Sequence, residues 1–303
     1  MRLARAPWLR LALAAAALLL LAGRSAGAPL RLADERGREV VLAAPALRIV
    51  SLLPSLTETV CALDACERLV GTDRYSNWPA SVRALPKLGG LEDTQIERVV
   101  ALRPDLVLAA RSARALDRLD ALGVATLALE PQNLAQTRQA IATVARALGR
   151  ADAGSRLIER LDERLTAAVA RVPAALRGKS VYLEVASTPH AAGQASYAGE
   201  LLARLGLVNI VPAALGPFPQ LNPEFVLHAQ PDIVMATAAV IAQMPRRPGW
   251  AALAALRTRQ LCGFDAEAWD TLVRPGPRLA DAAEVIVDCL DAIAQRDAPR
   301  RTR

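Results

Sequence analysis

Two glutamates lie in the same short sequence frame, once in each half of the chain. Aligned on Glu97 and Glu224, the segments 97–107 and 224–234 both read Glu-x-Val-x-x-x-x-Pro-Asp-(Leu/Ile)-Val. A pair of carboxylates can act as a general acid and base, or each can bind a cationic group of a partner. Both glutamates fall in the predicted first turn of a helix, where the helix dipole favours a carboxylate. Their position alone therefore does not indicate catalysis.

No complete catalytic motif can be assembled from the chain. Residues 178–180 read Gly-Lys-Ser like the end of a phosphate-binding loop, but Pro173 stands where the first glycine is required and a strand follows instead of a helix. The glycines around Ser196 are spaced too widely for a nucleophile elbow. The chain has two histidines, and His228 lies inside the second glutamate frame. Few histidines are therefore available for a Ser–His–Asp triad. We therefore predict that the protein is not an enzyme and has no catalytic residues.

Aromatic residues are scarce, at 3% of the chain, and several rings fall in predicted loops that follow strands. Open α/β sheets bind ligands at the carboxyl ends of their strands. Rings from both halves of the chain predict a pocket for a flat or bulky ligand, although any single ring could equally pack in the core. The candidate ligand-binding rings are Tyr75, Trp78, His190, Phe218 and Trp269. Arg274, in another predicted loop, could meet an anionic ligand or simply be solvated.

Buried runs typical of strands alternate with segments typical of helices. The run Arg48–Leu53 precedes a helix that Ser55 or Thr57 can cap. Pro104 ends the first glutamate helix, and a buried strand follows it. This alternation predicts an α/β fold with parallel-type sheets. Residues 265–278, whose second part is rich in Pro and Arg, are predicted to form a loop.

The same order of elements recurs in two halves, which are separated by a segment without any strand signal. Residues 151–172 predict one amphipathic helix, and about 20 helical residues span about 30 Å. Its apolar face contains Leu157, Ile158, Leu161, Leu165, Val169 and Val172. We therefore predict two similar lobes, 29–150 and 173–295, joined by this one rigid helix, with a ligand cleft between them.

Residues 1–28 have the three-part layout of a secretory signal peptide, with a basic start, an apolar run and small residues at the end. A membrane anchor is the alternative, but the apolar run is short for a span of about 20 residues. The formal net charge of +7 falls mainly in this leader and in the tail 296–303, which we expect to be a disordered end. Because the body between them is close to neutral, the charge does not indicate a nucleic-acid partner.

Four cysteines in a secreted chain predict two disulfides, for which three pairings are open. Cys61 and Cys66 are close neighbours across a helix end, whereas Cys262 lies in a predicted strand and Cys289 in the last helix. We favour Cys61–Cys66 with Cys262–Cys289. A zinc site is the rival interpretation, but the chain has no Cys-x-x-Cys motif, and so no metal site is predicted.

Taken together, five segments resemble the periplasmic substrate-binding proteins of ABC importers for cobalamin, haem and iron chelates. These segments are RIVSLLPSLTE, RYSNWP, IERVVALRPDLVLA, FPQLNPEFVLHAQPDIVMA and RPGPRL. The resemblance is closest to the cobalamin-binding members and covers residues 48–294. It implies a monomeric periplasmic receptor without a cofactor of its own, in which a long helix joins two lobes that close only slightly on their ligand.

The resemblance implies a role for the repeated glutamates. In this family a glutamate at the tip of each lobe docks onto arginine pockets of a dimeric permease in the inner membrane. Glu97 and Glu224 stand at these two positions. A partner with twofold symmetry needs two such contacts, and the duplicated lobe supplies them.

The resemblance also implies ligand contacts. Tyr75 and Trp78 match an aromatic ligand loop, and Trp269 resembles the tryptophan of the last ligand loop. Phe218 stands where cobalamin binders have a tryptophan, and His190 where one has a phenylalanine. The expected ligand is cobalamin or another corrinoid first, a ferric siderophore second, for which Arg274 is available, and haem third.

Overall fold

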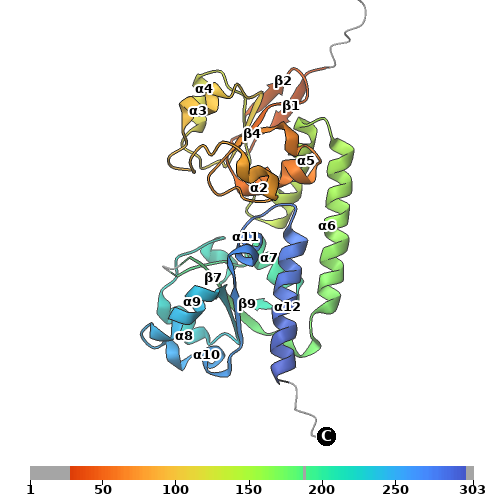
Figure 1. Cartoon of the computed structure of the whole chain (residues 1–303). Helices are drawn as coiled ribbons and strands as arrows, with labels where there is room; N and C mark the ends of the chain where they lie inside the picture. The colour runs from red at the N-terminus through yellow and green to blue at the C-terminus, as the bar shows by residue number, and fades with distance from the viewer. Residues whose placement is uncertain (1–27, 187–188, 298–303) are drawn as a thin grey trace, which may run out of the picture.

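The computed structural model describes residues 28–186 and 189–297, which form two lobes (Figure 1). The predicted leader, up to residue 27, and the tail from residue 298 lie outside the described residues. Within the described ranges, no helix combines the length and the apolar character that a membrane span requires.

The first lobe contains a four-stranded parallel sheet in the order β4-β3-β5-β6. Its strands are β3 (Ile49–Ser51), β4 (Leu69–Thr72), β5 (Leu106–Ala109) and β6 (Thr126–Ala128), and its helices are α2 (Pro54–Ala62), α3 (Ile96–Ala101), α4 (Leu116–Ala121) and α5 (Leu134–Ala147). An antiparallel hairpin of β1 (Leu30–Ala33) and β2 (Glu39–Leu42) precedes them. The sequence reasoning missed this hairpin, because two four-residue strands that are buried only at alternate positions give a weak signal.

The second lobe repeats the parallel arrangement around β7. β11, β10 and β7 are parallel neighbours, β9 pairs parallel to β7, and β8 pairs antiparallel to it. The strands are β7 (Ser180–Ala186), β8 (His190–Ala191), β9 (Val208–Asn209), β10 (Ile233–Thr237) and β11 (Leu261–Phe264). The helices are α7 (Tyr197–Arg204), α8 (Pro223–Ala229), α9 (Ala238–Gln243), α10 (Ala254–Thr258), α11 (Ala266–Leu272) and α12 (Leu279–Asp297). Two similar α/β lobes confirm the predicted fold class.

One long helix, α6 (Ala151–Arg171), runs along both lobes and packs on α5 in the first and on α12 in the second (Figure 1). Gly154 allows the close approach to α5, since a Cβ atom added there would lie 2.5 Å from the Cβ atom of Ala145. On the exposed side, Arg164 is ion-paired with Asp281 and Glu284 of α12, at 2.7 and 2.8 Å. The connection between the lobes is therefore a packed helix and not a pair of hinge strands.

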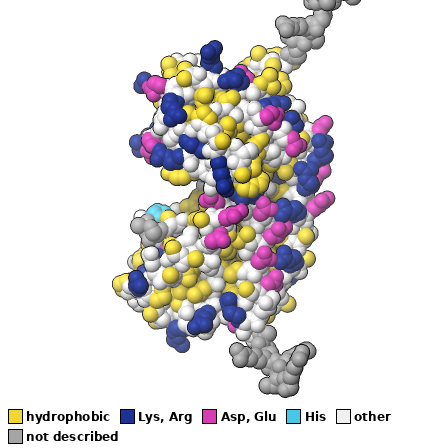
Figure 2. Space-filling model, viewed as in Figure 1, with side chains coloured by type: hydrophobic (Ala, Val, Ile, Leu, Met, Phe, Trp, Pro, Cys, Tyr) yellow, Lys and Arg dark blue, Asp and Glu magenta, His cyan; other side chains and the backbone are white. Residues whose placement is uncertain are grey.

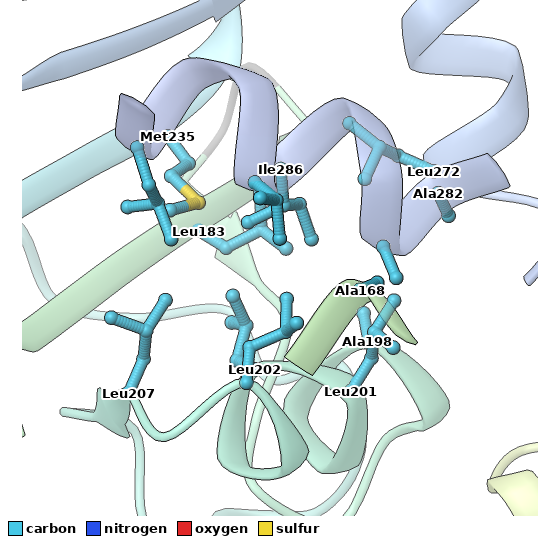
Figure 3. Close-up of a cluster of buried hydrophobic side chains, with 14 of the residues drawn as sticks. Ala168, Leu183, Ala198, Leu201, Leu202, Leu207, Met235, Leu272, Ala282 and Ile286 are labelled. Atoms are coloured by element: carbon cyan, nitrogen blue, oxygen red, sulfur yellow. The ribbon is translucent and has the colours of Figure 1, made fainter. Parts of the chain in front are cut away.

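The core of the second lobe is formed by side chains from both sheet strands and covering helices. Leu183 of β7 and Met235 of β10 meet Ile286 of α12 and Leu202 of α7, as Figure 3 shows. Leu161, Leu165 and Ala168 of α6 belong to the same cluster. Because α6 contributes to this core, its attachment to the second lobe is rigid.

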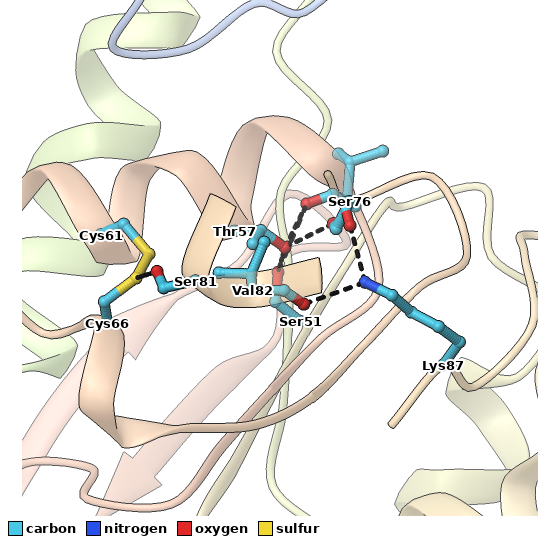
Figure 4. Close-up of a disulfide and its surroundings, with 9 residues drawn as sticks. Ser51, Thr57, Cys61, Cys66, Ser76, Ser81, Val82 and Lys87 are labelled. Atoms are coloured by element: carbon cyan, nitrogen blue, oxygen red, sulfur yellow. Dashed lines mark hydrogen bonds between the residues drawn. A yellow bond between two sulfur atoms is a disulfide. The ribbon is translucent and has the colours of Figure 1, made fainter. Parts of the chain in front are cut away.

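Both predicted disulfides are present. Cys61 of α2 is bonded to Cys66, and Cys262 of β11 is bonded to Cys289 of α12. Figure 4 shows the first bond near Thr57, whose hydroxyl donates to Ser51 Oγ at 2.9 Å. Each bond ties a helix to a neighbouring segment of its own lobe.

Two sequence predictions about the end of the chain are wrong. Residues 266–272 form the helix α11 and not a loop, because the Asp265 side chain caps it by accepting from the Ala268 N–H at 2.9 Å. The last helix runs two residues into the predicted disordered tail. Its end is held by a hydrogen bond from the Gln260 side chain to Asp297 Oδ2 at 2.8 Å.

The repeated sequence frame folds in the same way in both lobes. In each, the frame forms a short helix (α3 or α8) followed by a strand (β5 or β10). Asp105 accepts from the backbone N–H groups of Leu47 and Arg48, and Asp232 accepts from the N–H of Ser180 at 2.8 Å. The Pro-Asp part of the frame thus fixes the start of the neighbouring strand, β3 or β7.

Candidate ligand-binding cleft

A cavity of about 520 Å³ lies between the two lobes. The first lobe lines it with Leu53, Pro54, Ser55, Tyr75, Glu130, Pro131 and Gln132, and the second with Val185, Tyr197, Phe218, Trp269, Asp270, Val273, Arg274 and Pro275. Figure 2 shows the molecule hollowed between the lobes on the side away from α6. The lining segments of the first lobe follow β3, β4 and β6, so the cavity lies at the carboxyl ends of the parallel strands.

Four rings line this cavity. Tyr75, after β4, is 61% exposed. On the opposite lobe, Phe218 packs against Tyr197 with ring centroids 5.8 Å apart, and Trp269 stacks on Phe264 at 6.5 Å. Burial raises the pKa of the Tyr197 phenol, which therefore stays protonated. Tyr197 is a lining residue that the sequence reasoning missed.

Of the six predicted ligand residues, the structure brings four to the cavity and leaves Trp78 and His190 outside its lining. The Arg278 guanidinium lies over the Trp78 ring, 4.7 Å from its centroid. His190 forms the short strand β8 and bridges to Gln220. Trp78 contributes to the contact between the lobes, because Arg278 belongs to the second lobe.

A buried carboxylate of the first lobe holds two arginines of the second. Glu58 of α2 is 0% exposed. It accepts from Arg274 Nη1 at 2.8 Å and from Nε and Nη2 of Arg278 at 2.9 and 2.8 Å. Arg274 is also ion-paired with Asp270 at 2.8 Å. Arg274 therefore lines the cavity with its charge already neutralised, and its predicted contact with an anionic ligand stays a prediction.

Further contacts fix the two lobes on both sides of the cavity. Beside Glu58, Asn77 donates from Nδ2 to Asp270 at 2.8 Å. Gly276 packs on Ser55 so closely that an added Cβ would lie 3.2 Å from the Ser55 carbonyl oxygen. On the other side, the Tyr197 N–H donates to the carbonyl of Gln132 at 2.6 Å.

A sequence model of the periplasmic binding protein family matches residues 49–268, which is most of the chain and includes both repeated glutamates. The chain belongs to the periplasmic binding protein family. The chain is also similar to individual proteins that are named for the ligand they bind. The chain is 27% identical over 261 residues to the vitamin B12-binding protein of Vibrio cholerae, which covers 83% of this chain and 91% of that protein.

Solved structures of periplasmic binding proteins share the whole architecture. The vitamin B12-binding protein BtuF of Vibrio cholerae superposes with a TM-score of 0.70 at 27% identity, covering 83% of this chain and 99% of the other. The haem-binding protein BhuT, in complex with two haems, gives a TM-score of 0.70 at 30% identity and covers 81% and 98%. Both are periplasmic binding proteins, and this chain is accordingly a periplasmic binding protein and not an enzyme.

The first residues of α2 differ from the sequence prediction, in which Ser55 or Thr57 caps the helix. The N-cap residue is Leu53, and no side chain caps it. Ser55 is 3% exposed, and its hydroxyl has no hydrogen-bond partner in the described part of the chain. Thr57, two residues on, bonds instead to the buried hydroxyl of Ser51.

Replacing Ser55 by alanine is expected to leave the free energy of unfolding unchanged or to raise it by about 1 kcal/mol, because a buried hydroxyl without a partner is costly. Thr57→Val removes a hydroxyl with partners from the same helix and is expected to lose about 1 kcal/mol. Chemical denaturation of the two variants measures both values. An equal loss of stability in the two variants would show that the Ser55 hydroxyl is structurally bonded.

Proposed function

We propose that this periplasmic binding protein captures cobalamin or a related corrinoid in the interlobe cleft and delivers it to a dimeric ABC permease of the inner membrane. The signal-like leader supports a periplasmic location, and a monomeric receptor is part of the proposal. Haem or a ferric siderophore, carried by the same kind of importer, is the second candidate.

The two repeated glutamates support delivery to a symmetric partner. In each frame the valine is buried and the aspartate bonds within the chain, whereas Glu97 and Glu224 are exposed. Neither carboxylate has an ion-pair partner among the residues that the structure describes. Both helices lie on the side of the molecule opposite α6, one on each lobe (Figure 1). The same frame geometry in both lobes, each with a carboxylate outside any described ion pair, suits two equivalent arginine contacts.

Ring-lined walls from both lobes support a rigid, flat metal chelate as the ligand. Tyr75 from the first lobe and Phe218, Trp269 and Tyr197 from the second present apolar faces to one cavity. Rings make a large contact area at low cost in conformational entropy. The vitamin B12-binding relatives favour cobalamin among such chelates, while the similarity to a haem-binding structure keeps haem as the alternative.

An absorption titration of the mature protein is the direct test of the ligand. Cyanocobalamin is expected to bind saturably at one molecule per chain, with quenching of tryptophan fluorescence because Trp269 lines the cavity. Haemin and ferrioxamine B, titrated in parallel, are expected to bind more weakly. If haemin or ferrioxamine B binds more tightly than cyanocobalamin, that compound is the better candidate for the ligand. If none of the three binds, metal-chelate transport is rejected.

A further inference from the structure

The charges around the cavity can be assigned group by group. On the side of α2, two acidic groups (Glu58 and Asp270) face two basic groups (Arg274 and Arg278) in one closed network. These four charges balance. Arg274, the cation among the lining residues that the structure describes, is therefore already neutralised within the protein.

The other side of the cavity carries an acidic group that is held in place without a cation. Glu130 lies two residues after β6 and lines the cavity. Its two oxygens accept from the backbone N–H and the hydroxyl of Ser112, both at 2.9 Å. No ion pair of Glu130 exists within residues 28–186 and 189–297. Two hydrogen bonds to one residue fix both carboxylate oxygens, so the charge is held at this edge of the cavity.

The surroundings of Glu130 do not cancel this charge. Glu35 lies directly behind it and accepts from the Glu130 backbone N–H at 2.8 Å. Arg111 acts on Glu35 but is exposed and does not line the cavity. Burial raises the pKa of Glu35, and Arg111 opposes that rise. With both carboxylates ionised, Glu35, Glu130 and Arg111 leave a net charge of −1 on this side, and the net charge of the cavity lining is also negative.

We propose that Glu130 is a specificity-determining residue, which makes the cleft select a metal chelate with an uncharged rim and reject the same chelate when its rim carries carboxylates. This proposal rests on the proposed function, because it names the charge class of the ligand for that cleft. Two like charges several ångströms apart repel appreciably when part of the surrounding water is displaced. A neutral carboxamide rim meets no such repulsion, and the rings of the cleft bind both kinds of chelate alike.

Matched ligands that share a macrocycle and differ at the carboxylates of its rim test this assignment. Two pairs are suitable: cyanocobalamin with its monocarboxylic acid derivative, and haemin dimethyl ester with haemin. For wild-type protein we expect the neutral member to bind on the order of tenfold more tightly than the carboxylate member of the pair that binds. In Glu130→Gln, which keeps the size of the side chain, this ratio is expected to fall to about 1, through tighter binding of the carboxylate member.

Two controls separate the local charge from other effects. Asp117→Asn changes the net charge equally on an exposed position of the same lobe and is expected to keep the wild-type ratio. In wild-type protein, a rise in ionic strength should lower the ratio, since salt screens the repulsion; this arm does not depend on how any variant folds.

The outcomes distinguish the two proposals. A wild-type ratio of about 1, or an unchanged ratio in Glu130→Gln, overturns the role of Glu130 while the transport function stands. Binding of the haem pair alone rejects cobalamin as the ligand, and its ratio still decides the role of Glu130. Binding of neither pair rejects the proposed function and the specificity role together.

Discussion

Exchanging both Glu97 and Glu224 for lysine is expected to abolish ligand uptake by cells and to leave the ligand affinity of the purified protein unchanged. Each exchange would convert the proposed pairing with a permease arginine into repulsion between like charges. Neither glutamate lines the cavity. Uptake of radiolabelled cobalamin and titration of the purified variant measure the two quantities separately.

The matched control places the same change of charge on the opposite side of the molecule. Glu159 and Glu163 lie on the exposed face of α6, and their exchange for lysine is expected to keep uptake at the wild-type level. Each single variant, Glu97→Lys or Glu224→Lys, should lose part of the uptake because one of two contacts remains. Normal uptake by the double variant, or loss of its ligand affinity, would remove the docking role.

Local patterns account for what could be predicted from the sequence. The two lobes, the helix α6 and the repeated frame follow from hydrophobic periodicity and from prolines that end helices, which depend on residues close together in the chain. The helix α11 was not predicted, although Asp265 is a standard capping residue, because the Pro-Arg-rich stretch after it is typical of a loop. Tyr197 was missed because nothing in its own segment indicates which lobe face it lines.

Contacts between distant residues account for what could not be predicted. Glu58 reads as an ordinary helical glutamate, and its arginine partners are 216 and 220 residues away. Arg274 looked available for a ligand because its pairing with Glu58 has no local signature. Ser55 was expected to cap α2, but the helix begins at Pro54, and Ser55 lies under the distant segment around Gly276. Site chemistry between two lobes thus depends on pairings that a single sequence does not specify.

Replacing Glu58 by alanine is expected to lower the free energy of unfolding by about 3–5 kcal/mol, since the buried Arg278 loses its carboxylate and Arg274 keeps only that of Asp270. Arg274 and Arg278 are each 7% exposed, so water cannot replace the lost partner without opening the contact between the lobes. Denaturant unfolding gives the stability change. Ligand titration is expected to show weaker binding as well, because Arg274 and Asp270 form part of the cavity wall.

Arg164→Ala is the matched control, because it removes two ion pairs between two helices at an exposed position. Arg164 is 48% exposed in its pairing with α12, and such surface pairs contribute about 0–1 kcal/mol. A small loss in this variant beside a large loss in Glu58→Ala would show that burial of the cross-lobe pair, and not the number of ion pairs, determines stability. Equal small losses would mean that the lobes separate enough to hydrate both arginines, so that α6 alone sets the geometry of the cleft.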